Sequence, residues 1–141
     1  MTANASPALV RKVQGVWREG MRCDVTAGPF HLVVDEPVEF GGTNAGPQPT
    51  DLLLASVASC FALSLAFSAR KRGVALKGQT VDVTGVYEGP RFRSIQVKAR
   101  LDCEPSEVEA LLGAAQRVCY VTNTLKSDVP IAFSAEAVAT D

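Results

Sequence analysis

The sequence predicts an α+β fold in which antiparallel strands pack around one long apolar helix. Residues Leu52 to Ala69 form an uncharged run of 18 residues, long enough for a central helix. Residues Phe92 to Leu101 alternate apolar and polar side chains, which is typical of an antiparallel strand with one buried face. The strand-like segments do not alternate regularly with helices, so the pattern excludes a doubly wound parallel sheet.

Length and composition indicate one ordinary globular domain. The 141 residues predict a single domain over residues 1–141, with residues 1–8 as a flexible tail. Hydrophobic residues make up 47% of the chain and charged residues 21%, which is enough apolar material for a core. A net charge of −1 gives no electrostatic basis for binding nucleic acid. The N-terminal residues lack the apolar stretch of a secretory signal, so we expect a cytoplasmic protein.

Four cysteines are the main candidates for catalytic or metal-binding residues. They are expected to be reduced thiols in the cytoplasm. None lies in a Cys-x-x-Cys pair, and with one histidine in the chain their spacing fits no zinc pattern. They are Cys23, Cys60, Cys103 and Cys119.

The N-terminal third predicts a three-stranded antiparallel meander. Turn signals at Glu19-Gly20 and Ala27-Gly28-Pro29 separate segments that are rich in β-branched side chains. A long glycine-rich loop from Phe40 to Pro47 then leads into the helix. The three expected strands are Val10–Arg18, Met21–Thr26 and Phe30–Asp35.

The central helix has boundary signals at both ends. Thr50 or Gln48 can cap its N-terminus, where Asp51 also complements the helix dipole. A basic cluster at 70–72 complements the C-terminal end, and Gly73 can adopt the left-handed conformation that ends a helix.

A transmembrane span is the alternative for this helix. Its uncharged run would extend roughly 27 Å, slightly less than a hydrocarbon core of about 30 Å. Small side chains recur every four residues and form one stripe that includes Cys60. Because the strands elsewhere need an apolar partner, the sequence favours a buried core helix and no membrane. The stripe contains Ser56, Cys60, Ser64 and Ser68.

The C-terminal half predicts two strands, a second helix and a final strand. The strands are Thr80–Tyr87 and Phe92–Leu101, separated by a turn at Glu88-Gly89-Pro90. Ser106 and Glu109 have the spacing of a capping box, and helical periodicity continues to Cys119. Residues 123–129 read as a polar loop, and Ile131 to Val138 as the last strand. The predicted order is β-β-β-α-β-β-α-β.

Two segments carry a resemblance to a known family. GPQPTDLLLASVASCF and AAQRVCYVTNTL resemble the first and second cysteine motifs of the OsmC/Ohr family of osmotically inducible and organic hydroperoxide resistance proteins. The resemblance implies an intertwined homodimer in which sheets surround two long central helices. It also implies that Cys60 attacks an organic hydroperoxide and that Cys119 resolves the product as a disulfide. A thiol or dihydrolipoyl reductant would then restore both thiols, with no metal or organic cofactor.

The sequence departs from the family pattern near the expected site. Family peroxidases carry a glutamate ten residues before the first cysteine, and this position is Thr50 here, followed by Asp51. Asp51 can substitute for this glutamate, but it lies one residue further along the helix, and its side chain is therefore rotated by about 100° around the helix axis. The resemblance also implies an activating arginine in the N-terminal hairpin, where Arg18 and Arg22 are both candidates and Arg22 is favoured. For both arginines the alternative is a solvated charge, and for Asp51 it is compensation of the helix dipole.

The sequence therefore leaves two candidate functions open. The first is a cysteine-based peroxidase that reduces organic hydroperoxides as a homodimer. The second is a non-enzymatic dimeric stress protein of the same fold that binds a small hydrophobic ligand, which the loss of the glutamate at Thr50 favours. In that case Cys60 is a buried, unreactive thiol, as most free cysteines are.

Overall fold

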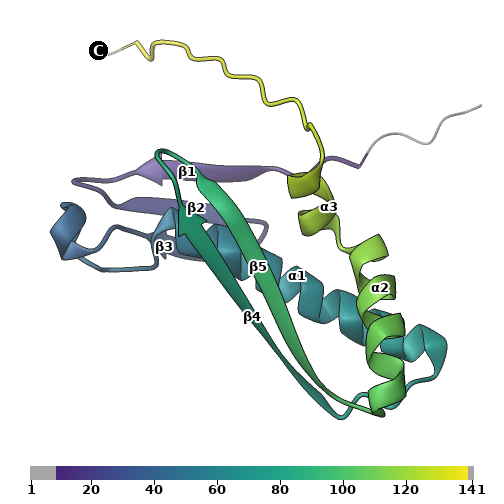
Figure 1. Cartoon of the computed structure of the whole chain (residues 1–141). Coiled ribbons are helices and arrows are strands. Elements are labelled where there is room, and N and C mark those ends of the chain that lie inside the picture. The colour runs from purple at the N-terminus through teal and green to yellow at the C-terminus, as the bar shows by residue number, and fades with distance from the viewer. Residues whose placement is uncertain (1–8, 140–141) are drawn as a thin grey trace, which may run out of the picture. The chain divides into compact units, whose positions relative to one another are not determined.

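The computed structural model describes residues 9–139 of the chain, so the tail predicted at residues 1–8 lies outside them. The chain divides into two compact units, Met1–Leu53 and Leu54–Asp141. Each unit is described by itself below, with its elements labelled in Figure 1. That residues 1–141 form a single domain stays a prediction.

The first unit contains the predicted three-stranded meander. Strands β1 (Val13–Trp17), β2 (Cys23–Ala27) and β3 (Phe30–Val34) form one antiparallel sheet in that order. Both turns use glycine in the left-handed region, Gly20 with φ 54° and Gly28 with φ 59°. The turn signals in the sequence therefore placed all three strands correctly, since glycine adopts positive φ without a steric penalty.

A buried aspartate organises the loop between β3 and the long helix. Asp35 is 1% exposed and accepts hydrogen bonds from the amides of Glu36 (2.8 Å) and Ala45 (3.1 Å). It also accepts hydrogen bonds from the hydroxyl (2.6 Å) and the amide (3.2 Å) of Thr43. The Thr43 hydroxyl, followed by the amides of Glu36 and Ala45, lowers the pKa of Asp35 to about 2 despite its burial. A Cβ atom at Gly42 would collide with the Glu36 carbonyl oxygen, so this close loop requires glycine there.

The long helix α1 extends from Pro49 to Arg72, close to the predicted limits. Its end follows the predicted mechanism: Gly73 has φ 69°, and the Val74 amide bonds the Ala69 carbonyl at 2.8 Å. By length and composition alone α1 could cross a membrane, a test that core helices of soluble proteins also pass. Within residues 9–139 only one face of α1 is covered. Its other face leaves Leu63 72% and Phe67 45% exposed.

The second unit contains the predicted hairpin. Strands β4 (Gly78–Tyr87) and β5 (Phe92–Asp102) pair antiparallel, with Val83 opposite Val97. The rings of Tyr87 and Phe92 stack beside the turn, with their centroids 4.8 Å apart. The Gln79 side-chain amide donates a 2.8 Å hydrogen bond to the Ala62 carbonyl and so joins β4 to α1.

Two consecutive helices complete this unit. A 3₁₀ turn, η2 (Pro105–Glu107), precedes α2 (Val108–Val118), and α3 (Tyr120–Lys126) follows after a single non-helical residue, Cys119. The core of the unit joins one face of α1 to α2, with the apolar face of the hairpin packed against it. Its fully packed members are Phe61, Leu65, Ala69, Leu111, Ala115 and Cys119. The fold class is thus α+β with antiparallel sheets, as predicted.

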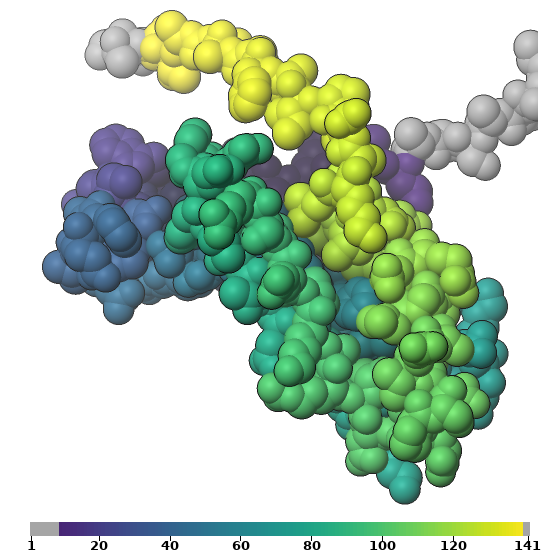
Figure 2. Space-filling model, in the orientation of Figure 1, coloured from purple at the N-terminus to yellow at the C-terminus, as the bar shows by residue number. Residues whose placement is uncertain are grey.

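Four local expectations require correction. Ser106 and Glu109 form no capping box, because α2 starts at Val108 without a side-chain cap. The expected loop at 123–129 is helical as far as Lys126. Cys119 lies between helices instead of within one. Residues 131–138 form no strand in the described chain; they extend beyond α3, where Ile131 is 75% and Phe133 92% exposed (Figures 1 and 2). A strand exists only where a partner strand provides hydrogen bonds, and no described segment of this chain does so.

Candidate redox site and groove

The structure brings Cys60 and Cys119 together in the second unit. Cys60 lies in the middle of α1 and is half-buried against the core cluster that contains the fully buried Cys119. Cys60 packs against the cluster that contains Cys119, and the Cys60 thiol is among the groups that favour the Cys119 thiolate. The two motif cysteines, 59 residues apart in the sequence, therefore form one thiol pair.

The helix break sets the environment of Cys119. The backbone of Cys119 is extended, with φ −80° and ψ 103°, which interrupts the helix. Cys119 is the residue immediately before α3. Burial raises the pKa of the Cys119 thiol. The hydroxyl and amide of Thr122, together with the Cys60 thiol and the Ser64 hydroxyl, outweigh burial, and the pKa lies below its ordinary value. Cys119 is thus a fully buried thiol whose pKa is lowered by its neighbours.

The small-residue stripe of α1 explains how a second thiol reaches Cys60. Ser64 and Ser68 are buried, at 7% and 4% exposure, and the Ser64 hydroxyl donates a 2.7 Å hydrogen bond to the Cys60 carbonyl. Small side chains on this line let the α2–α3 segment approach the helix closely. The spacing of four that singled out the stripe in the sequence therefore has a packing role in addition to placing Cys60.

The remaining cysteines lie outside this pair. Cys23 is on β2 in the first unit, where its sulfur lies 4.0 Å from the Asp24 carbonyl oxygen. Cys103 follows β5, with its sulfur 3.6 Å from the Glu104 carbonyl oxygen. Among the residues that the structure describes, no group of three His, Cys, Asp or Glu side chains could hold a metal ion.

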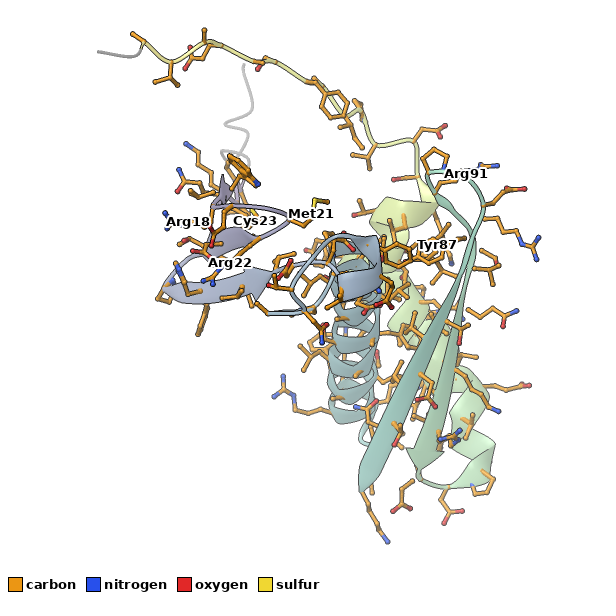
Figure 3. The ribbon with its side chains drawn as sticks, turned by 90° about the vertical axis from the view of Figure 1, so that its left-hand side faces the viewer. Arg18, Met21, Arg22, Cys23, Tyr87 and Arg91 are labelled. Carbon is orange, nitrogen blue, oxygen red and sulfur yellow. The ribbon has the colours of Figure 1, made fainter. Side chains whose placement is uncertain are left out.

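Both candidate arginines lie in the first unit and share one partner. The Arg18 Nε atom is 2.8 Å from one carboxylate oxygen of Asp24, and the Arg22 Nε atom is 3.1 Å from the other. Figure 3 labels both arginines on the β1–β2 hairpin. The hydrogen bond from Arg18, assisted by Arg22, lowers the pKa of Asp24 although its burial opposes this. Asp51 lies in the first turn of α1, where it accepts a 3.3 Å hydrogen bond from the Gln48 side chain.

Sequence reasoning missed three residues that contact these groups. Asp24 is one of them, and its usable signal was an acidic side chain that follows two arginines closely at the start of a strand. Thr122 and Ser64 were not connected with Cys119, because only the helix break places them near its sulfur.

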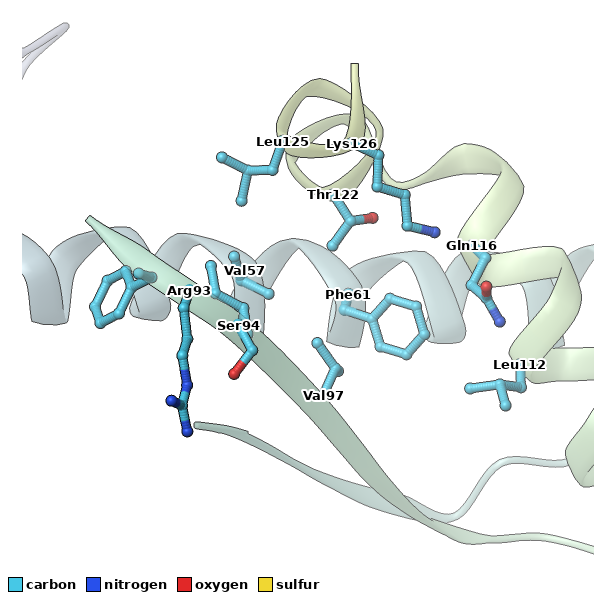
Figure 4. Close-up of a pocket in the computed structure, with 12 residues that line it drawn as sticks. Val57, Phe61, Arg93, Ser94, Val97, Leu112, Gln116, Thr122, Leu125 and Lys126 are labelled. Carbon is cyan, nitrogen blue, oxygen red and sulfur yellow. The ribbon is translucent and has the colours of Figure 1, made fainter. Parts of the chain in front are cut away.

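A groove of about 470 Å³ opens beside the thiol pair within the second unit. Its walls come from α1, β5, α2 and α3, as Figure 4 shows. Phe61 follows Cys60 in the chain, and Thr122 contacts both the groove and Cys119. The lining is mainly apolar and includes two cations, Arg93 and Lys126, with no acidic side chain among the lining residues.

Comparisons with known proteins support one family. The family model described as OsmC-like protein matches residues 42–134. An OsmC-like protein from Mycoplasma pneumoniae is 17% identical, with a TM-score of 0.75 over 85% of this chain and 89% of that one. No curated protein matches the chain.

Two further solved structures share the fold. An organic hydroperoxide resistance protein OsmC from Legionella pneumophila is 21% identical, with a TM-score of 0.67 over 87% of this chain and 93% of that one. A putative organic hydroperoxide resistance protein from Vibrio cholerae, with captopril bound in one of its active sites, is 23% identical. Its TM-score is 0.68 over 89% of this chain and 92% of that one.

Proposed function

Because the chain belongs to the OsmC-like family, we propose that it is a thiol-dependent peroxidase that reduces organic hydroperoxides. Solved relatives with the same fold are called organic hydroperoxide resistance proteins, which supports this class of substrate. The observation that carries the proposal is the packing of Cys60 against the core cluster that contains Cys119.

Cys60 is the thiol assigned to the first step. As a thiolate it attacks the outer oxygen of the hydroperoxide, the O–O bond breaks, and an alcohol leaves after taking a proton. Cys60 is oxidised to a sulfenic acid. Attack requires access, and Cys60 is half-buried whereas Cys119 is fully buried. The difference in exposure therefore supports the attacking role that we propose for Cys60.

Cys119 is the thiol assigned to the second step. Its thiolate attacks the Cys60 sulfenic sulfur, a disulfide forms, and the oxygen leaves as water after protonation. The groups around Cys119 favour its thiolate, which is the form that this step needs. A small dithiol, such as a dihydrolipoyl group, then reduces the disulfide and is itself oxidised to a disulfide. Over the whole cycle, one hydroperoxide and one dithiol are converted to an alcohol, water and a disulfide, and no step needs a metal or an organic cofactor.

We expect the protein to act as a cytoplasmic homodimer. Within the described residues one face of α1 is uncovered, and the β-patterned segment 131–138 has no partner strand. Exposed apolar surface of this kind is typical of an interface.

One experiment tests the proposed chemistry. The reduced protein is mixed with one equivalent of cumene hydroperoxide, its remaining thiols are alkylated, and its disulfides are mapped by peptide mass spectrometry. We expect one disulfide per chain, between Cys60 and Cys119. Cys60→Ser should abolish the reaction, and Cys119→Ser should leave a Cys60 sulfenic acid that proceeds to sulfinic acid with excess oxidant.

Cys103→Ser is the matched control, because Cys103 also packs against the core but lies outside the pair. It should form the disulfide at the wild-type rate. A folded protein that keeps Cys60 reduced under hydroperoxide would refute the proposal, and so would a disulfide to Cys103.

The groove favours a second candidate function, the binding of a small hydrophobic molecule without turnover. Its volume of about 470 Å³ lies within the range of small-molecule sites. Saturable binding of a fluorescent apolar probe by a protein whose thiols resist hydroperoxide would support this function instead. Leu112→Glu, which places a charge at a half-exposed position of the groove, should then weaken binding of the probe.

A further inference from the structure

One end of the groove in the second unit is formed by an irregular part of the β4–β5 hairpin. Tyr87 pairs with Phe92, whereas the residue before Tyr87 pairs with Ser94. Arg93 is therefore an extra residue without a partner on β4, which makes a β-bulge. Four consecutive residues, 92–95, line the groove, although regular alternation would direct every second side chain to the opposite face. The bulge thus directs additional side chains of β5 to the groove.

A glycine in β4 makes room for one of these side chains. A Cβ atom at Gly85 would lie 2.6 Å from the Phe92 ring, so a larger residue at this position would displace the ring. The same ring stacks on Tyr87. A glycine inside a strand weakens it, and a bulge disrupts the hydrogen bonds of the ladder. Neither feature stabilises the hairpin, but both shape the end of the groove.

The groove combines an apolar floor with positive charge. Its lining residues include two cations, Arg93 and Lys126, and no acidic side chain. Within residues 9–139 neither cation forms an ion pair with a carboxylate. In the view of Figure 4, the buried Val57 and Phe61 lie between the two cations. A ligand with an apolar body and an anionic end would complement both parts of this surface.

The two cations differ in what else they do. Lys126 lies in the last turn of α3, where a positive charge also compensates the helix dipole. Arg93 is exposed at the bulge of a strand and has no such role. Its planar guanidinium can donate two parallel hydrogen bonds to one carboxylate, which an ammonium group cannot do. Arg93 is therefore the better candidate for recognition of an anionic group.

We propose that Arg93 is a specificity-determining residue of the groove, which selects small apolar molecules that carry a carboxylate. Phe92 and Phe61 contact the apolar body of the ligand, and Arg93 binds its carboxylate with Lys126 as a second cation. The inference rests on the proposed function only where it concerns turnover. In the proposed cycle, Arg93 would favour organic hydroperoxides that carry a carboxylate over neutral ones.

The test compares two ligands of the same shape that differ in charge. The reduced protein is titrated with 4-phenylbutyrate and with 4-phenylbutyramide by calorimetry at pH 7, where a carboxylate is ionised. Because Arg93 is exposed and water screens its charge, we expect the acid to bind roughly three- to tenfold more tightly than the amide. This preference should shrink when the salt concentration is raised from about 20 mM to about 500 mM.

Three variants assign the preference to residues. Arg93→Gln should give the two ligands equal affinities and leave binding of the amide unchanged. Lys98→Gln is the matched control, because Lys98 is an exposed cation on the same strand that does not line the groove. It should keep the preference of the wild type. Phe92→Leu should weaken both ligands alike, since the ring contacts the apolar body that they share.

Several outcomes would overturn the inference. They are failure of both ligands to bind, equal binding of acid and amide by the wild type, a preference that survives in Arg93→Gln, and a preference that disappears in Lys98→Gln or Phe92→Leu. Circular dichroism on each variant checks that the proteins compared are folded. If Phe92→Leu unfolds, the exposed substitution Arg93→Gln decides the matter.

Binding needs neither hydroperoxide nor reductant, so the two proposals can fail separately. If hydroperoxide forms the Cys60–Cys119 disulfide but the wild type binds acid and amide equally, the role of Arg93 is refuted and the peroxidase stands. If Arg93 sets the preference for the acid but hydroperoxide leaves Cys60 reduced, the role of Arg93 stands and the peroxidase is refuted.

Discussion

Two adjacent leucines on α2 allow a sharp test of how Cys119 is sealed. Leu111 is 0% exposed and belongs to the core cluster with Cys119. Leu112, the next residue, is 38% exposed and lines the open groove. Leu111→Ala and Leu112→Ala make the same chemical change, so their difference reports enclosure alone.

The structure sets the size of each effect. Leu111→Ala leaves an enclosed cavity, and such changes lower the free energy of unfolding by about 2.7–5.0 kcal/mol. Leu112→Ala loses part of its apolar contact but leaves no closed cavity, which gives about 1 kcal/mol. Urea unfolding of both variants at one protein concentration, with their m-values compared, measures the two free energies.

The same substitutions should change access to the buried thiol. Alkylation of Cys119 in the native protein requires an opening reaction. If that opening disrupts the core cluster, a loss of about 3–5 kcal/mol accelerates labelling by about 10²- to 10³·⁵-fold in Leu111→Ala, at tenfold per 1.4 kcal/mol. Leu112→Ala should label less than about tenfold faster. Equal labelling in both variants would show that a local fluctuation, independent of the core, exposes Cys119.

Two further predictions concern hydrogen bonds that shift a pKa. The folded-state pKa of Asp35 is lowered to about 2, so its stabilising effect is present above its ordinary pKa of 3.8 and is lost as the pH falls towards 2. Asp35→Asn should therefore be less stable than wild type at pH 7, with the difference in free energy of unfolding shrinking below pH 4; a constant difference down to pH 2 would contradict this. Thr122→Val should raise the pKa of Cys119, read from thiolate absorbance in a chain carrying Cys60→Ser. Thr124→Val, whose hydroxyl bonds the Tyr120 carbonyl on the same helix, is the control and should leave that pKa unchanged.

The sequence was sufficient for elements whose signals are local. The β4–β5 hairpin has strict alternation and a glycine turn, and both survive in the structure from Gly78 to Asp102. The end of α1 was equally readable, because only a residue that tolerates positive φ ends a helix as Gly73 does.

Features that depend on distant partners were not readable. Helical spacing continues through Cys119, and no glycine or proline from Arg117 to Val121 marks the break that puts this thiol before α3. The cluster around Asp24 depends on a turn that returns Arg18 and Arg22 to one strand. The final strand has the right period, but its periodicity does not tell whether a partner strand is available.

The cysteine at the helix break also has a consequence for the direction of electron flow. The groups that lower the pKa of Cys119 stabilise its thiolate, which exists only in the reduced form of the pair, and a disulfide cannot benefit from them in the same way. Stabilising the reduced form raises the reduction potential of a thiol pair, so its disulfide becomes a better oxidant. In the proposed cycle, the hydroxyl groups of Thr122 and Ser64 would therefore make the disulfide easier for a thiol donor to reduce.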